Sequence, residues 1–281
     1  MGFGCNAAGV IGCRIIESPR ERLIAIITNV FVPCNGRFPT LIAIGTIFIG
    51  GTTGGAFQSI ASTVALTSIV LLGIFMTLLV SFILSKTILK GLPSSFTLEL
   101  PPFRNPQIGR IIIRSIFDRT LFVLGRAVAI AAPAGLVIWL MANITIGETN
   151  LLTYAAGFLD PFGRLLGMDG YIIMAFILGL PANEIVIPII IMSYMASGSM
   201  LEIEKLEDLR QILVNNGWTW LTGVCVMLFS LMHFPCATTL WTIRKETRST
   251  KWMLASFAIP TAIGVIVCFV VASVVRLLGL V

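Results

Sequence analysis

Charged residues are scarce in this sequence. Only 11% of its 281 residues are Asp, Glu, Lys or Arg and 57% are hydrophobic, whereas soluble globular domains carry about 25% charged residues. This balance excludes a soluble globular protein. Four runs approach or exceed the roughly 20 apolar residues that a helix needs to cross a bilayer: 57–85, 120–142, 217–241 and 252–280. The sequence therefore predicts an all-α integral membrane protein, a bundle of several helices that span the lipid bilayer.

Several catalytic signatures are absent. The sequence contains no G-x-x-x-x-G-K-[S/T] segment, so it has no phosphate-binding loop of that type. Its one histidine, His233, has no aspartate and serine partners at a recognisable spacing, which argues against a hydrolytic triad. The absence of H-E-x-x-H excludes a metalloprotease of that type. We therefore expect a protein that is not an enzyme.

The six cysteines lie within or beside apolar runs, and no close pair resembles a zinc or redox motif. We expect free thiols. A cysteine in an apolar helix usually behaves as a small hydrophobic residue, and this is our interpretation of Cys13, Cys225 and Cys268. Residues 1–16 lack the basic segment that opens a signal peptide.

The net charge of +6 comes from cations that cluster in short segments between the apolar runs. Cytoplasmic loops of membrane proteins carry an excess of Lys and Arg, so the basic segments 14–22, 86–119 and 244–251 are expected to be cytoplasmic. The acidic segments 143–170 and 198–216 are expected to be external. The charge thus reflects topology in the cytoplasmic membrane, crossed several times, and we expect no nucleic-acid partner.

Residues 171–197 lie between the two acidic segments, so both of their ends are expected outside. The motif G-L-P-A-N-E at 179–184 places helix breakers in the middle of this run. A re-entrant hairpin resolves the conflict, with half-helices at 171–179 and 185–197. Because non-helical backbone at membrane depth needs protein or a water-filled cavity around it, we expect the break to face a cavity.

A second set of breaks suggests an internal repeat. G-F-G-C-N at 2–6 matches G-L-P-A-N at 179–183, and each is followed by a loop and then a Pro-Cys break, at 33–34 and at 235–236. The first loop is basic and the second is acidic, so the two units would have opposite orientations. Inverted repeats with broken helices are typical of secondary transporters, whose substrate site lies between them at mid-membrane. The alternative is two unrelated proline kinks.

The breaks carry a mixed set of polar side chains: Cys5, Asn6, Cys34, Asn35, Arg37, Asn183, Glu184, His233 and Cys236. Thiolates suit soft metals, while carboxylate and amide oxygens suit harder ions. The mixture therefore favours a borderline divalent metal, such as iron(II), manganese(II) or zinc(II). Two simpler roles stay open: His233 could bond a carbonyl freed by Pro235, and Glu184 could cap the half-helix that follows it.

These motifs identify a resemblance. G-F-G-C-N, P-C-N-G-R-F-P at 33–39, G-L-P-A-N-E and H-F-P-C-A-T-T-L-W-T-I-R-K-E-T at 233–247 resemble the membrane domain of the ferrous iron transport protein B family. In that family a GTP-binding domain precedes a membrane part with two gate repeats. The resemblance places metal ligands at Cys5, Cys34, Cys236, Asn183 and Glu184, with Asn6, Asn35 and His233 in support. It also implies Fe2+ as transported substrate, with GTP and Mg2+ acting only through the GTP-binding part.

The chain departs from the family pattern at its start, where the GTP-binding domain and the first half-helix of the first gate are missing. We expect a fragment, a product of a split gene or a truncated frame, and as partner a GTP-binding half or subunit; a second copy of the chain is a further candidate. The usual proline soon after Asn6 is also absent. The resemblance divides the chain into the rest of the first gate repeat (1–90), a cytoplasmic loop and interfacial helix (91–119), a connecting span and external loop (120–170), the second gate repeat (171–252) and a C-terminal transmembrane helix (253–281).

The hypothesis is the membrane permease portion of a ferrous iron importer. Two alternatives remain. A nucleoside-type or other organic-solute transporter would use the breaks to hydrogen-bond its ligand and would not need the cysteines. A non-conducting scaffold subunit of a split transporter would co-purify with a second polypeptide.

Overall fold

The structure is a computed structural model that describes residues 2–52, 57–91, 109, 113, 122–146, 149–195 and 205–280. Its regular elements are almost all helical. Two short strands, β1 (Thr145–Ile146) and β2 (Thr149–Asn150), form one antiparallel pair. The architecture confirms the predicted all-α membrane class. The predicted cytoplasmic loop and interfacial helix at 91–119 fall almost entirely outside the described residues.

Long apolar helices make up much of the molecule. In the described part of the chain, three helical stretches are long and apolar enough to cross a bilayer, namely α4 (Phe57–Lys86), Trp220–Thr247 and α13 (Thr250–Leu277). Helix α6 (Phe122–Asn143) is also long and contains Pro133. Leucine and phenylalanine side chains stay exposed along α4, which suits contact with lipid tails.

Two spans are broken where the sequence has Pro-Cys. The first consists of α2 (Pro19–Thr28) and the 3-10 helix η2 (Asn29–Phe31). It resumes as α3 (Phe38–Ile44), which continues into the π-helix η3 (Gly45–Ile49) and the 3-10 helix η4 (Gly50–Thr52). The second consists of α11 (Trp220–Met232) and α12 (Ala237–Thr247). Proline has no N–H for the helical ladder, so Pro33 and Pro235 account for the interruptions.

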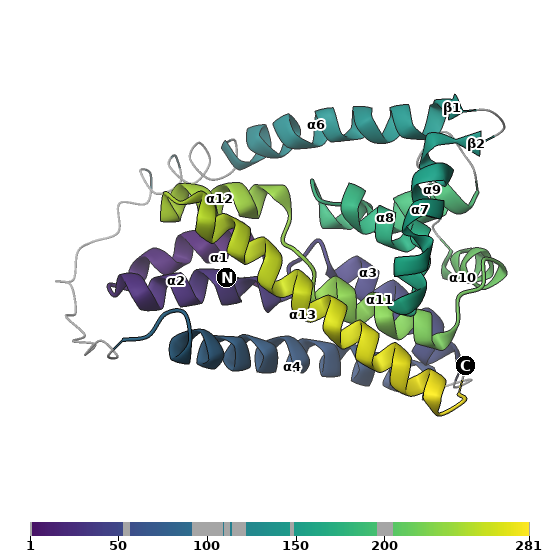
Figure 1. Ribbon diagram of the computed structural model, residues 1–281, viewed down its shortest axis with the longest axis horizontal. Coiled ribbons are helices and arrows are strands. Elements are labelled where there is room, and N and C mark those ends of the chain that lie inside the picture. The colour runs from purple at the N-terminus through teal and green to yellow at the C-terminus, as the bar shows by residue number, and fades with distance from the viewer. Residues whose placement is uncertain are drawn as a thin grey trace.

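A helical hairpin occupies residues 170–194. Helix α8 (Gly170–Leu178) runs into the break, and the turn η6 (Asn183–Ile185) leads into α9 (Val186–Tyr194). The two short helices agree with the prediction around G-L-P-A-N-E, although Asn183 and Glu184 already belong to the first turn of the return. Figure 1 shows both helices at the same end of the molecule.

The base of the hairpin is held by a chain of hydrogen bonds. Asp169 caps α8, because its Oδ1 accepts from the backbone N–H of Ile172 at 2.7 Å. Its other carboxylate oxygen accepts from the hydroxyl of Tyr194 at the end of α9. The indole N–H of Trp218 donates to the Tyr194 oxygen at 2.7 Å. The side chain of Asp169 therefore fixes the start of the hairpin to its end and to the residues before α11.

Two amphipathic helices lie in the segments predicted as external loops. Helix α7 (Leu151–Leu165) is bent by 108° from α8, so this part of 143–170 is helical and not a simple loop. It buries Leu152 and Ala156 and exposes Tyr154 and Phe158. Helix α10 (Leu206–Asn215) buries Leu209 and Leu213 in the same way.

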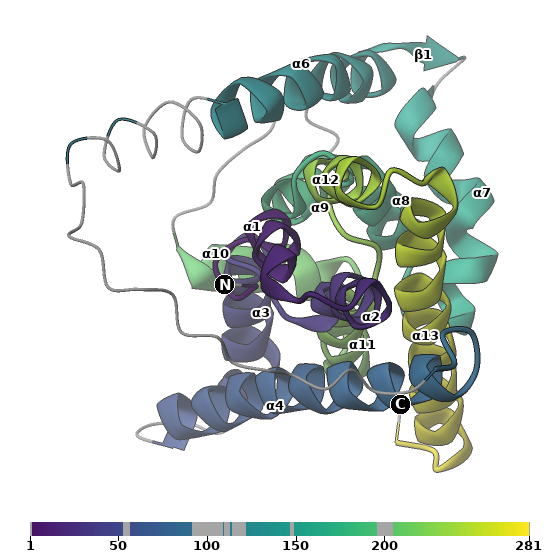
Figure 2. The ribbon, with the colours of Figure 1, turned by 90° about the vertical axis from the view of Figure 1, so that its left-hand side faces the viewer.

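The two ends of the molecule differ in charge. In Figure 1 the turns after α1 (Asn6–Gly12) and η1 (Cys13–Ile15) and between α12 and α13 lie at one end, whereas β1, β2 and α10 lie at the other. The first end carries the basic segments and the second carries the acidic ones. Figure 2 shows α1, α2, α9 and α12 in the middle, with α4, α6 and α13 around them.

Glycines let a continuous helix approach each broken span. A Cβ on Gly73 of α4 would lie 2.8 Å from the carbonyl oxygen of Phe31, and one on Gly264 of α13 would lie 3.1 Å from that of Met232. Both carbonyls belong to residues just before a Pro-Cys break. The backbone of α4 thus packs closely on the first broken span, and that of α13 packs closely on the second.

Candidate functional site at the helix breaks

Each Pro-Cys break pairs with the Gly-x-x-x-Asn break of its own half. The backbone N–H of Asn35 donates to the carbonyl of Gly4 at 3.1 Å, and that of Ala237 donates to the carbonyl of Leu180 at 2.7 Å. Cys5 and Ala182, which precede Asn6 and Asn183, have nearly the same backbone angles, φ −150° and ψ 124° against φ −151° and ψ 119°. The corresponding segments therefore share local geometry and a similar contact.

The first Pro-Cys break also meets the tip of the hairpin from the other half. The amide nitrogen of Asn183 faces the sulfur of Cys34 at 4.0 Å, and both side chains are buried. A Cβ on Gly36 would lie 3.6 Å from a carboxylate oxygen of Glu184. Because Gly36 has no side chain, the Glu184 carboxylate can approach the backbone of the first break. Thiol, amide and carboxylate donors thus converge from opposite halves.

Three buried polar atoms near the breaks have no hydrogen-bond partner: Oδ1 of Asn183, Nε2 of His233 and Nε of Arg37. Buried polar groups without partners are rare in folded proteins, and each calls for an explanation such as a water or an ion. The free oxygen of Asn183 lies on the same amide group that faces Cys34. This amide oxygen is an acceptor available to a cation.

Cys5 and Cys236 each precede a helix that follows a break. Cys5 is exposed at the start of α1, and Cys236 is partly exposed at the start of α12. The Cys236 sulfur lies 3.3 Å from the hydroxyl oxygen of Thr239. Of the three thiols predicted as metal ligands, only Cys34 is buried.

The supporting residues have structural roles. The Asn6 amide, in the orientation that satisfies its hydrogen bonds, donates to the carbonyls of Gly2 at 3.1 Å and Val32 at 3.2 Å. Asn35 is exposed, and the contact described for it is through its backbone. Nδ1 of His233 pairs with the carbonyls of Phe229 at 3.0 Å and Ser230 at 2.9 Å. His233 thus binds its own helix.

Arg37 was not predicted as a ligand, yet it lies at the centre of the breaks. Its side chain is fully buried, and its four Nη protons go to backbone carbonyls of both halves: Val30 at 3.0 Å, Leu231 at 2.9 Å, His233 at 3.1 Å and Phe234 at 3.2 Å. The Leu231 carbonyl is the one that Pro235 cannot bond. The expectation that His233 takes this carbonyl is therefore wrong, because Arg37 takes it.

The predicted ligands do not form one closed coordination shell. Over the residues that the structure describes, no group of three or more His, Cys, Asp or Glu side chains is arranged to hold a metal ion. Asn183, Cys34 and Glu184 come together, whereas Cys5 and Cys236 lie at the starts of α1 and α12. This arrangement resembles a series of weak contacts more than a single tight site.

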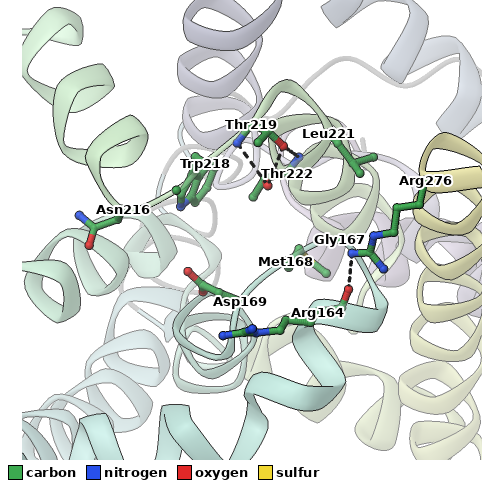
Figure 3. Close-up of a pocket in the computed structure, with 11 residues that line it drawn as sticks. Arg164, Gly167, Met168, Asp169, Asn216, Trp218, Thr219, Leu221, Thr222 and Arg276 are labelled. Atoms are coloured by element: carbon green, nitrogen blue, oxygen red, sulfur yellow. Dashed lines mark hydrogen bonds between the residues drawn. The ribbon is translucent and has the colours of Figure 1, made fainter. Parts of the chain in front are cut away.

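A hollow lies at the opposite end of the hairpin, away from the breaks (Figure 3). It has a volume of about 310 Å³ and is lined in part by Arg164, Asp169, Trp218, Thr219 and Arg276. The Arg276 guanidinium donates to the carbonyl of Arg164 at 2.5 Å. None of the predicted ligands lines it.

An ion pair ties the two halves together at the basic end. Arg14 donates through Nε and Nη2 to the two carboxylate oxygens of Glu246, at 2.7 and 2.6 Å. Because the Arg14 side chain is 62% exposed, we expect Glu246→Gln to lower the free energy of unfolding by only about 0.5 kcal/mol. Thermal unfolding in detergent at low and high salt would measure this. Glu207→Gln, which removes a looser pair inside α10 at 3.8 Å, is the matched control, and a loss above about 2 kcal/mol would contradict the expectation.

Two family models match parts of the chain. The family model described as "Ferrous iron transport protein B C terminus" matches residues 66–118, and the model described as "Nucleoside recognition", called Gate, matches residues 124–250. The second match contains the hairpin at 170–194 and the second Pro-Cys break. No solved structure matches the chain.

Curated relatives match nearly the whole chain. A Staphylococcus aureus protein named "Fe(2+) transporter FeoB" is 30% identical over 272 residues, which cover 96% of this chain and 39% of that protein. Proteins with the same name from Methanocaldococcus jannaschii and a Synechocystis species are 26% and 28% identical, covering 99% and 92% of this chain and 40% of each relative. The chain therefore spans about two fifths of the length of the relatives it matches.

Proposed function

We propose that this chain, which corresponds to the membrane part of the ferrous iron transport protein B family, forms the permease through which Fe2+ crosses the cytoplasmic membrane. The ion would pass between the helix breaks. Cys34, Cys5 and Cys236 would serve as soft ligands, and Asn183 and Glu184 would serve as oxygen ligands. The relatives are named as Fe(2+) transporters, and iron(II) accepts both kinds of donor.

One observation carries the proposal. Cys34 of the first half meets Asn183 and Glu184 of the second half, and the buried Oδ1 of Asn183 has no partner. A mixed set of donors at a junction of broken helices is what a borderline divalent cation needs when it sheds part of its water. Two unrelated proline kinks would not be expected to bring these donor groups of the two halves together.

The arrangement of the proposed ligands suits weak binding of an ion that is released again, and not tight binding at one site. An ion channel or carrier must bind its ion strongly enough to admit it and weakly enough to release it, usually at several sites. The donors near the breaks are spread over two half-helix starts and a buried tip. We therefore expect modest affinity at each step.

GTP and Mg2+ would act only through a GTP-binding half or subunit, since the chain has no phosphate-binding loop of its own. We propose that such a half biases the gate, and that a second copy of the chain is a further candidate partner. The Arg14–Glu246 pair at the basic end lies on the side where a cytoplasmic half would bind.

Anaerobic uptake of labelled Fe2+ tests the proposal in metal-starved cells that lack their own importer. The chain is expressed alone and together with the GTP-binding part of the Staphylococcus aureus relative. We expect Cys34→Ser and Cys236→Ser each to lower uptake at least about tenfold, because a hydroxyl is a far poorer ligand for iron(II) than a thiolate.

Cys268→Ser is the matched control. Its sulfur donates to the Cys225 carbonyl at 3.5 Å, away from the breaks, and a hydroxyl can keep that bond. Uptake that is the same in all three serine variants would remove the thiols from the ion path.

A second candidate is an organic-solute transporter, because the model that matches residues 124–250 is described as "Nucleoside recognition". Uptake of a labelled nucleoside that survives loss of the cysteines would favour it. A third, a scaffold subunit, would be favoured if neither solute is taken up and the chain co-purifies with a second polypeptide.

A further inference from the structure

Arg37 places a fixed positive charge in the middle of the helix breaks. Its side chain is 0% exposed, and guanidinium stays protonated in proteins. None of the ion pairs in the described part of the chain includes Arg37. Its partners are four backbone carbonyls, which orient the group but bring no formal negative charge.

The titratable groups that interact electrostatically with this charge are two thiols and one imidazole. Cys34, three residues earlier, and Cys236, from the other half, act on Arg37, and Arg37 acts on His233. The two cysteines are proposed ligands of the transported ion. The fifth N–H of the guanidinium, on Nε, has no hydrogen-bond partner. A cation that reaches Cys34 therefore comes under the influence of a buried positive charge that carbonyls hold in place.

We infer that Arg37 is a selectivity-determining residue, which excludes hard divalent cations from the breaks while admitting thiophilic ones. This inference rests on the proposed function. A dication held by two thiolates forms a unit with no net charge, so the field of Arg37 has little effect on it. A hard dication such as Ca2+ prefers carbonyl, carboxylate and water oxygens, keeps most of its charge and is repelled by Arg37.

The location of Arg37 strengthens this repulsion. Charges interact more strongly in a buried region than in water, and salt screens them less there. The carbonyls of Leu231, His233 and Phe234 come from α11 and the second break, while Val30 comes from the first half. Because both halves hold the guanidinium, its charge cannot simply swing away when an ion arrives.

The test compares metal binding by the purified full chain in detergent without oxygen. Co2+ reports thiolate binding through its near-ultraviolet absorption, and Ca2+ is titrated by calorimetry. In the unmodified chain we expect Co2+ to bind and Ca2+ to bind far more weakly. In Arg37→Met we expect the affinity for Ca2+ to rise at least about tenfold, with a much smaller change for Co2+.

Arg37→Lys is the conservative control, because lysine keeps the positive charge but cannot bridge four carbonyls. We expect it to keep the discrimination between Co2+ and Ca2+. If Arg37 had only a structural role, the lysine and methionine variants would have the same affinities, and the affinities for Co2+ and Ca2+ would change equally. That result would overturn the inference. Arg37→Gln is a second neutral variant that can still donate to two of the carbonyls, and it is expected to lose discrimination as the methionine variant does.

Failure of the inference is separable from failure of the proposed function. If the unmodified chain binds Co2+ and the neutral variants still reject Ca2+, the ion path stands and the role of Arg37 falls. If the unmodified chain gives no thiolate absorption with Co2+, the proposed path itself falls, and the inference falls with it.

Discussion

Alanine in place of Gly170 is expected to prevent α8 from packing on α7. A Cβ at this position would lie 1.9 Å from the carbonyl oxygen of Ala156 and 2.8 Å from the backbone nitrogen of Asp160. Both are backbone atoms, so no side chain can rotate away. We expect a loss of about 3 kcal/mol in the free energy of unfolding, as for severe overpacking, together with loss of Fe2+ uptake because the hairpin tip shifts. Thermal unfolding in detergent measures the first effect.

The control for this change is Gly157→Ala in α7. Nothing lies within 4 Å of a Cβ at Gly157, and alanine is a better helix former than glycine by up to about 1 kcal/mol. We expect this variant to be as stable as the original or slightly more so. Equal unfolding temperatures for the two variants would contradict the close approach of α7 and α8.

Replacing Asp169 with alanine is expected to open the base of the hairpin. The change removes the N-cap of α8 and leaves the Tyr194 hydroxyl without its acceptor. A lost cap costs about 1 kcal/mol, and the half-buried Tyr194 hydroxyl, which loses its acceptor, adds about 1 kcal/mol, so we expect a total of about 2 kcal/mol. Thermal unfolding in detergent gives the change in stability.

Limited proteolysis would show where the structure loosens. We expect new cleavage near residues 165–170 in Asp169→Ala and none in Asp208→Ala, since Asp208 is exposed in α10. If Asp169→Ala unfolds at the same temperature as the original chain, the hydrogen-bond chain from Trp218 through Tyr194 to Asp169 contributes nothing to the hairpin.

The breaks were predictable because their causes are local. Pro33, Pro235 and the run 179–184 interrupt apolar helices through the covalent structure of proline and the freedom of glycine, and these effects depend on neighbouring residues only. Consequently the two Pro-Cys breaks and the two short helices of the hairpin agree with the structure. The sides of the membrane were predicted from short basic and acidic segments and stay a prediction. The inverted repeat remains a prediction, supported by the matched backbone angles of Cys5 and Ala182.

The role of Arg37 could not be predicted, because its partners are distant in sequence. Three of its four carbonyls lie 194 to 197 residues away. A carbonyl has no side-chain signature, so nothing in the sequence marks which ones meet an arginine. Helix α7 was missed for a different reason. An external loop was predicted because residues 143–170 carry acidic side chains. The apolar side chains of α7 gave no signal of a span, because a helix of 15 residues is too short to cross the bilayer.

The position of Arg37 also limits how alike the two halves can be. In the proposed repeat, Pro33 corresponds to Pro235, so Arg37 corresponds to Thr239, which is buried and uncharged. A centre shared by two related units has room for one guanidinium, since a second would meet the first with no carboxylate between them. The halves must therefore differ where they meet.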